Sequence, residues 1–139
     1  MMSKGGEKMK HFVFFTTLLT VLCVNIAWAD RMAVKVEVAN VRSGPGTKYS
    51  VQWKLEQYHP IEVIEKSGPW YHFKDFEGDR GWIHKSLLNK TKTVIVKKNK
   101  CNVRSGSGTN YEVLFTVERG VPFKVLERKG KWIHILHQD

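Results

Sequence analysis

The stretch Asn40-Val-Arg-Ser-Gly-Pro-Gly-Thr-Lys-Tyr49 recurs later in the chain as Asn102-Val-Arg-Ser-Gly-Ser-Gly-Thr-Asn-Tyr111. At this offset of 62 residues, Ala39–Glu77 aligns without a gap with Cys101–Asp139, and 16 of the 39 positions are identical. Self-similarity at a fixed offset indicates a repeated structural unit. The chain of 139 residues is therefore a tandem duplication of a unit of about fifty residues, which is the size of the smallest self-standing domains.

Each unit is predicted to consist of short strands. Val34–Val38 alternates apolar and polar residues, which is the period of a half-buried strand. Further strands are predicted at Val51–Leu55, Ile61–Lys66, Trp70–Phe73 and Arg80–His84, because clusters of Gly, Pro, Ser and Asp separate these runs. Five short strands of even spacing favour an all-β fold, either a small barrel or a sandwich.

The repeated motif is predicted to form a tight turn. Gly44-Pro45-Gly46-Thr47 fits a type II turn, in which Pro45 presets φ and Gly46 takes a positive φ. The second copy replaces Pro45 with Ser107 and keeps Gly108. This agrees with the turn type, because a side chain at the position of positive φ would be strained.

The second copy stops short of the first. In the first copy Gly78–Leu88 supplies a final strand and two leucines that cover the barrel floor, whereas the counterpart would be residues 140–150, beyond Asp139. The second barrel is thus predicted to lack its last strand and to have an unpaired strand edge. We expect residues 98–139 to be the less stable half, or to be completed by strand exchange in a homodimer.

The first 29 residues have the three parts of a secretory signal peptide. Three lysines at the start precede the apolar run Phe12–Ile26 and the small-x-small end Ala27-Trp28-Ala29. A retained membrane anchor is the alternative, but Asn25 interrupts a run that is already short of the roughly 20 apolar residues a span needs. We expect cleavage after Ala29 and a mature protein that is periplasmic or secreted.

The chain is basic. It has 23 Lys plus Arg against 13 Asp plus Glu, a formal charge of +10, and residues 30–139 alone retain 20 basic and 12 acidic groups, or +8. These basic residues are dispersed apart from Lys97, Lys98 and Lys100. An exported protein rarely meets nucleic acid, so we expect no nucleic-acid partner and favour contact with anionic polymers or lipid headgroups of the envelope.

Three motifs together resemble the bacterial SH3-like domain, often called SH3b. They are the repeated motif from Asn40, Lys-Ser-Gly-Pro-Trp-Tyr-His-Phe from Lys66, and Gly-Asp-Arg-Gly-Trp-Ile-His-Lys-Ser-Leu-Leu from Gly78. The resemblance covers Val36–Leu88 completely and Lys98–Asp139 in part. It implies two small SH3-like β-barrels, at residues 30–89 and 98–139, with a basic linker or strand at 90–97. Members of this family bind cell-wall peptides, glycans or proteins.

Strand alternation separates an apolar face from an aromatic one. Tyr71 and Phe73 should point into the barrel, so Trp70 and His72 share the outer face, and Trp132–Ile135 repeats this pattern. An indole beside an imidazole suits stacking on a sugar or a peptide plane, although each tryptophan could instead cover the end of its barrel. The candidate ligand-binding residues are Asn40, Arg42, Tyr49, Trp70, His72, Trp82, Asn102, Arg104, Tyr111, Trp132 and His134.

The polar residues at the start of the repeated turn have two interpretations. Asn40 and Arg42 suit a structural role, in which the asparagine bonds nearby backbone and the arginine packs its stem over an aromatic ring. The other interpretation is a polar lip for a ligand. We favour the structural role for both copies.

Catalytic and metal sites are not predicted. Six histidines include no His-x-His pair, and no helix is predicted that would align metal ligands. Cys101 occupies the place of Ala39, where a small buried cysteine is the ordinary interpretation. No Ser/His/Asp arrangement stands out, so we expect neither an enzyme nor a cofactor.

These features favour an exported, non-enzymatic binding module. We expect its ligand to be peptidoglycan, either peptide or glycan, held between the Ser43–Tyr49 turn and the Trp70 hairpin. The alternatives are a periplasmic protein–protein adaptor and the targeting remnant of a cell-wall hydrolase.

Overall fold

The computed structural model describes residues 10–14 and 30–137. The chain divides into a first unit that ends at Thr93 and a second unit that begins at Val94 and includes the N-terminal strand; we call them the first and second domain. The described part is built of strands, and its one helix is the short 3-10 turn η1 (Lys85–Leu87), so the all-β prediction is confirmed. No helix in this part is long and apolar enough to cross a membrane.

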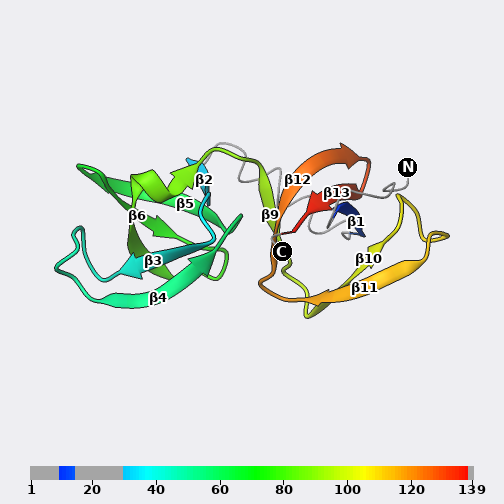
Figure 1. The fold of residues 1–139 in the computed structure, drawn as a ribbon, viewed down its shortest axis with the longest axis horizontal. Helices are drawn as coiled ribbons and strands as arrows, with labels where there is room; N and C mark the ends of the chain where they lie inside the picture. The colour runs from blue at the N-terminus through cyan, green and yellow to red at the C-terminus, as the bar shows by residue number, and fades with distance from the viewer. Residues whose placement is uncertain (1–9, 15–29, 138–139) are drawn as a thin grey trace. The chain divides into compact units, whose positions relative to one another are not determined.

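The first domain is one seven-stranded antiparallel sheet (Figure 1). Its strands follow the order β4-β3-β7-β6-β5-β2-β8 across the sheet. Four of the five predicted strands are confirmed to within two residues. In chain order the strands are β2 (Arg31–Val34), β3 (Val38–Arg42), β4 (Val51–Glu56), β5 (Pro60–Ser67), β6 (Trp70–Lys74), β7 (Arg80–His84) and β8 (Leu88–Asn89).

The strand predicted at Val34–Val38 is wrong. The chain leaves β2, bends through three residues and then enters β3. Gln57 holds this bend, because its side-chain amide donates to the Lys35 carbonyl at 3.0 Å and its backbone N–H donates to the Glu37 carbonyl at 3.2 Å. Val34 is nevertheless fully buried. The alternation does not match burial along the whole run either, because Val38, its last apolar residue, is 60% exposed.

The second domain repeats this architecture with a different source for one strand. Its sheet order is β11-β10-β1-β13-β12-β9, and β1 takes the place that β7 has in the first domain. The open edge predicted for this domain is therefore wrong, because β1 lies between β10 and β13 and pairs with both. Its strands are β1 (Lys10–Phe14), β9 (Thr93–Ile95), β10 (Lys100–Arg104), β11 (Val113–Glu118), β12 (Pro122–Lys129) and β13 (Trp132–Leu136).

The predicted signal peptide falls mostly outside the described residues. Of residues 1–29 the structure describes only Lys10–Phe14, as strand β1. The predicted cleavage position after Ala29 lies outside the described residues.

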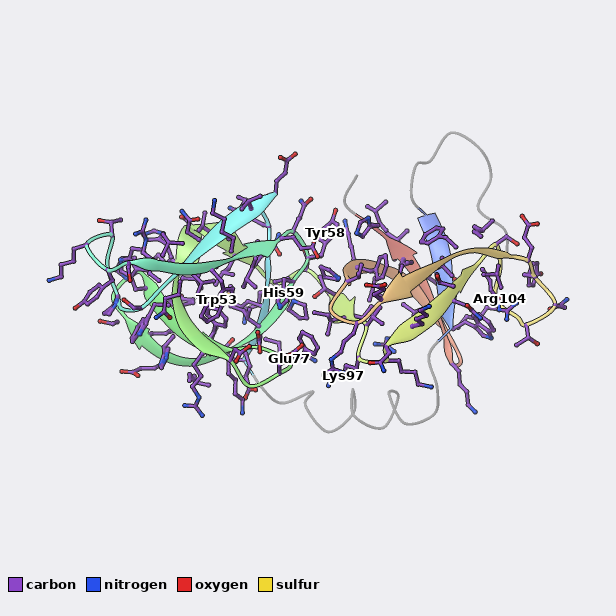
Figure 2. All side chains as sticks on the ribbon, turned by 90° about the horizontal axis from the view of Figure 1, so that it is seen from below. Trp53, Tyr58, His59, Glu77, Lys97 and Arg104 are labelled. Atoms are coloured by element: carbon purple, nitrogen blue, oxygen red, sulfur yellow. The ribbon has the colours of Figure 1, made fainter. Side chains whose placement is uncertain are left out.

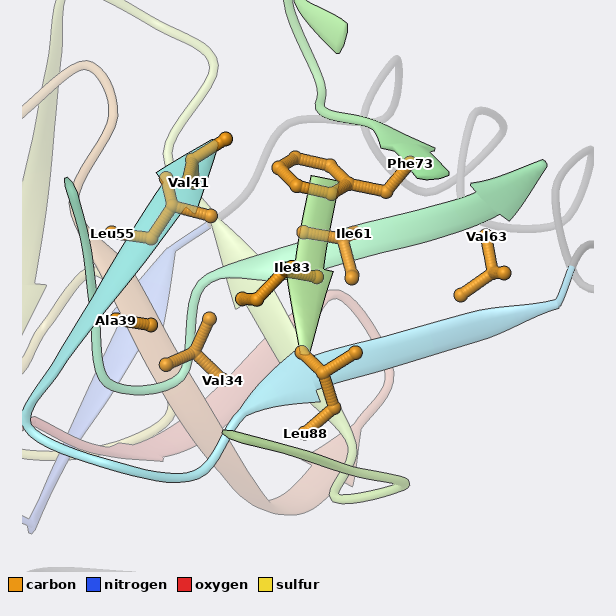
Figure 3. Packing of buried hydrophobic residues seen from close by; sticks show 9 residues of the cluster. All are labelled: Val34, Ala39, Val41, Leu55, Ile61, Val63, Phe73, Ile83 and Leu88. Atoms are coloured by element: carbon orange, nitrogen blue, oxygen red, sulfur yellow. The ribbon is translucent and has the colours of Figure 1, made fainter. Parts of the chain in front are cut away.

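Each domain has its own apolar core, made by the inward-facing positions of its strands. Cys101 is 8% exposed in the place of the fully buried Ala39, which confirms the interpretation of this thiol as a core residue. The first core consists of Val34, Ala39, Val41, Leu55, Ile61, Val63, Phe73, Ile83 and Leu88 (Figure 3). The second consists of Val94, Val96, Cys101, Val103, Val117, Phe123, Ile133 and Ile135.

The repeated turn is not a type II turn, so that prediction is wrong. Gly46 does not have a positive φ. The N–H of Gly46 donates to the Gly44 carbonyl at 2.9 Å, and the N–H of Tyr49 donates to the Gly46 carbonyl at 3.2 Å. The tyrosine ring covers Gly44 so closely that a Cβ there would lie 2.5 Å from the ring carbon Cδ1. The motif needs this glycine for close approach rather than for φ, and the second copy repeats the geometry at Gly106.

A different turn, the one that precedes β5 in the first domain and β12 in the second, has a residue of positive φ, and the two copies place different residues there. Tyr58 has φ of 71° in the first domain, where the second domain has Gly120 with φ of 90°. In both copies the N–H at this position donates to a valine carbonyl, from Tyr58 to Val34 at the end of β2 and from Gly120 to Val96 just after β9, each at 2.8 Å. Tyr58 therefore holds a strained conformation that glycine adopts freely.

Candidate functional site

The candidate site lies on the hairpin formed by β6 and β7. Asp75 and Gly78 shape its turn, because the Asp75 carboxylate accepts from the backbone N–H groups of Glu77 at 2.9 Å and Asp79 at 3.0 Å. Gly78 has φ of 87°, which the tight return of the chain requires. This turn sets the register of the two strands and therefore which side chains stand side by side.

The hairpin has an apolar inner face and an aromatic outer face, as the alternation predicts. Phe73 and Ile83 are fully buried, and Tyr71 packs against the same core. Gly81 lies opposite Phe73, and a Cβ at this glycine would lie 2.3 Å from Cγ1 of Val41. The outer face carries Trp70, His72, Trp82 and His84, all half-buried, and we call these four residues the Trp/His platform.

The register pairs each tryptophan of the platform with an imidazole of the other strand. His72 lies opposite Trp82, and their rings stack at 4.6 Å between centroids with planes 9° apart. Trp70 lies opposite His84, and these rings meet edge to face at 5.1 Å and 89°. The platform thus presents two indoles whose orientations are fixed by imidazole neighbours.

Polar contacts orient both imidazoles. Nδ1 of His84 accepts from the Ser86 backbone N–H at 3.2 Å and lies 2.7 Å from the Ser86 hydroxyl. Since Nδ1 accepts, the proton of neutral His84 resides on Nε2, which can donate to a ligand. His72 is held by Glu65, whose carboxylate oxygen lies 3.6 Å from Nδ1. Glu65 is mostly exposed, so its carboxylate is available to water and to a ligand.

The repeated turn borders the platform through Arg42. This residue lies opposite Trp82 in the sheet. Its guanidinium donates to the carbonyls of Thr47 at 3.1 Å and Tyr49 at 2.9 Å. Arg42 therefore braces the turn from within the domain, while Asn40 is exposed on the same strand and Tyr49 is 37% exposed on the turn.

The second domain holds the matching residues with one difference. Arg104, labelled in Figure 2, donates to the Thr109 carbonyl at 3.2 Å and the Tyr111 carbonyl at 3.0 Å, as Arg42 does in the first copy. Asn102 is exposed, and Trp132 and His134 are half-buried on β13. The strand beside β13 is β1 rather than a copy of β7, so Phe12 and Phe14 lie opposite His134 and Trp132 in the sheet.

Three features of the platform were not predicted from the sequence. His84 pairs with Trp70, Glu65 contacts His72, and the basic pair Lys74 and Arg80 continues the outer face beyond Trp82. Alternation along Arg80–His84 places Trp82 and His84 on one face, so this signal was present in the sequence. The sequence does not show the register in which these two residues pair with β6.

Neither a metal site nor a reactive thiol is found in the described part of the chain. No group of three or more His, Cys, Asp or Glu side chains there could hold a metal ion. Burial raises the pKa of the Cys101 thiol above its usual range, although Lys98 acts in the opposite direction. A buried thiol of raised pKa has little thiolate at neutral pH and is a poor nucleophile.

Two stretches of the chain match family models, both described as bacterial SH3 domain, over residues 35–90 and 99–139. Among curated proteins, the chain is 27% identical over 139 residues to the protein named "Putative N-acetylmuramoyl-L-alanine amidase YrvJ" of Bacillus subtilis (strain 168). The match covers 91% of this chain and 27% of that relative, so the chain spans about a quarter of the relative's length.

Two solved structures, NlpC1 and NlpC2 of Trichomonas vaginalis, also match the chain. Their TM-scores are 0.36 and 0.31, at 11% and 13% identity. The matches cover 97% and 94% of this chain and 46% and 47% of those structures. Likeness at this level carries no argument about function.

Proposed function

Because the chain belongs to the bacterial SH3 domain family, with two copies in tandem, we propose that it is an exported, non-enzymatic protein that binds peptidoglycan of the cell envelope. The name of its relative supports this ligand, since the N-acetylmuramoyl-L-alanine bond joins the glycan and peptide parts of peptidoglycan. The chain spans only 27% of that relative, so we do not extend amidase activity to it.

The observation that carries the proposal is the Trp/His platform. Indole and imidazole rings stack on the apolar faces of sugars and on peptide planes, and half-buried rings lose little freedom when a ligand covers them. Arg80 stands next to the platform on the outer face, where it would attract the carboxylates of a wall peptide. Lys74 lies opposite Arg80, and its Nζ is already 3.6 Å from a carboxylate oxygen of Glu62. His84 Nε2–H adds a donor for a carbonyl or hydroxyl oxygen.

Sedimentation with purified cell-wall sacculi tests the proposal. We expect the wild-type protein to sediment with the sacculi, and Trp70→Ala to bind about fivefold more weakly, since one stacking contact contributes about 1 kcal/mol. The far-ultraviolet circular dichroism and melting midpoint of the variant should stay close to those of the wild type, because Trp70 lies outside the core.

Ile64→Ala is the matched control. Ile64 is 38% exposed and lies at the irregularity of β5, outside the platform, so its loss removes apolar surface without touching the rings. Equal weakening by both substitutions would show that the platform is not the site. Absence of wild-type binding at low salt would contradict the peptidoglycan proposal and favour the protein–protein adaptor.

A further inference from the structure

Strands β10 and β13 of the second domain do not pair with each other. Strand β1 runs between them and is antiparallel to both. Its ladder with β13 extends over all five of its residues, from Lys10 opposite Leu136 to Phe14 opposite Trp132. The space between β10 and β13, which we call the strand slot, is thus occupied by a segment more than eighty residues away in the sequence.

Strand β1 occupies the slot in the same register that β7 has in the first domain. Phe12 lies opposite Arg104 on one side and His134 on the other. Trp82 lies opposite the counterparts of these residues, Arg42 and His72. The correspondence holds on both neighbouring strands, so it specifies one alignment of β1 with β7 and excludes a shift by one residue.

This alignment matches the two strands in sequence as well. In this register Lys10, Phe12, Val13 and Phe14 correspond to Arg80, Trp82, Ile83 and His84, so four of the five positions share a residue class: basic, large aromatic, β-branched aliphatic and ring. The fifth position differs, because His11 corresponds to Gly81, where a Cβ would lie 2.3 Å from Cγ1 of Val41. In the first domain this strand buries Gly81 and Ile83, the positions that correspond to His11 and Val13. The register therefore aligns Val13 with the buried Ile83, whereas His11 departs from the glycine of the first domain.

An empty strand slot would be energetically costly. A missing strand would leave the inward edges of β10 and β13 with unpaired N–H and carbonyl groups beside Val103, Ile133 and Ile135, which are almost fully buried. In the first domain the corresponding strand edges are paired by β7, which follows β6 directly in the chain.

We infer that the strand slot is a strand-acceptor site and that its ligand is Lys10–Phe14 of the same chain. The segment that resembles a leader is then also the closing strand of the second domain, and its departure would open the slot. This inference is independent of peptidoglycan binding, since it concerns backbone pairing in the second domain alone.

Hydrogen exchange of the full-length chain, read by mass spectrometry, tests the inference. Val13→Pro removes a ladder donor and should raise the exchange rates of the β10 and β13 amides by about tenfold or more. The β3 and β6 amides of the first domain should keep their rates and serve as the internal reference. Val13→Ala, which keeps the backbone N–H that Val13→Pro removes, is the matched control and should leave the β10 and β13 amides much closer to their wild-type rates.

A second variant tests the register. Replacing β1 with the sequence of β7 (Lys10→Arg, His11→Gly, Phe12→Trp, Val13→Ile and Phe14→His) should keep β10 and β13 at least as protected as in the wild type. Wild-type protection in Val13→Pro would overturn the inference, as would an equal effect of Val13→Ala. Loss of protection in the β7-sequence variant would show that the slot does not accept strands by this register.

Discussion

His59 is the one buried polar or charged residue in the described part of the chain, at 7% exposure (Figure 2). Its ring lies 6.1 Å from that of Phe76, and Nε2 has no hydrogen-bond partner among the described residues. Burial lowers the pKa of His59 below its ordinary 6.5, and the charge of Asp75 opposes this only in part. The second copy has Val121 at this position and packs it against its core.

The first domain should therefore lose stability on acidification. The unfolded chain, whose histidine titrates near pH 6.5, takes up a proton that folded His59 resists, so stability is highest above pH 6.5 and falls as the pH drops below it. Urea unfolding at a series of pH values measures this slope. His59→Val, which copies Val121, should flatten the slope between pH 6.5 and pH 5, and an unchanged slope would assign the effect to other groups.

At the scale of elements, two equivalent core positions carry a phenylalanine and an isoleucine in opposite order in the two domains. On β5 and β6 the first domain buries Ile61 and Phe73. On β12 and β13 the second domain buries Phe123 and Ile135 at the equivalent positions. One aromatic ring and one isoleucine are present in each case, so the volume is conserved while the strand that carries the ring changes.

This exchange predicts a coupling between the two strands of the first domain. Phe73→Ile should cost about 1–3 kcal/mol by leaving a cavity, and Ile61→Phe should cost a similar amount by overpacking. The double substitution, which copies the second domain, should be more stable than the sum of the two by about 1 kcal/mol or more. Denaturant unfolding of the four proteins completes the cycle, and additive effects would mean that the two positions do not share a volume.

At the scale of the whole molecule, the N-terminal segment has two features. Its basic start and apolar run resemble those of an export signal, while Lys10–Phe14 pairs with two strands of the second domain. Export is part of the proposed function, and cleavage after Ala29 would leave 110 residues with a formal charge of +8. That charge favours the anionic polymers outside the cytoplasm.

The intact mass of the protein recovered from outside the cytoplasm shows whether the N-terminal segment is cleaved or retained. We expect a mass that corresponds to residues 30–139, because the small-x-small end at Ala27–Ala29 suits signal peptidase. Recovery of the full-length chain would instead show that the segment stays with the protein, and β1 would then remain available to the second domain.

The sequence by itself determined the duplication, four of the five strands predicted in the first copy, the inward face of Tyr71 and Phe73, and the burial of Cys101. These features follow from local periods and from a repeat, which need no knowledge of what lies across the sheet. Only the tertiary structure decided that Trp82 stacks on His72, that Tyr49 covers Gly44, and that Lys10–Phe14 closes the second domain. Each of these depends on pairing between segments apart in the chain, and alternation states which face a residue takes but not which strand will lie beside it.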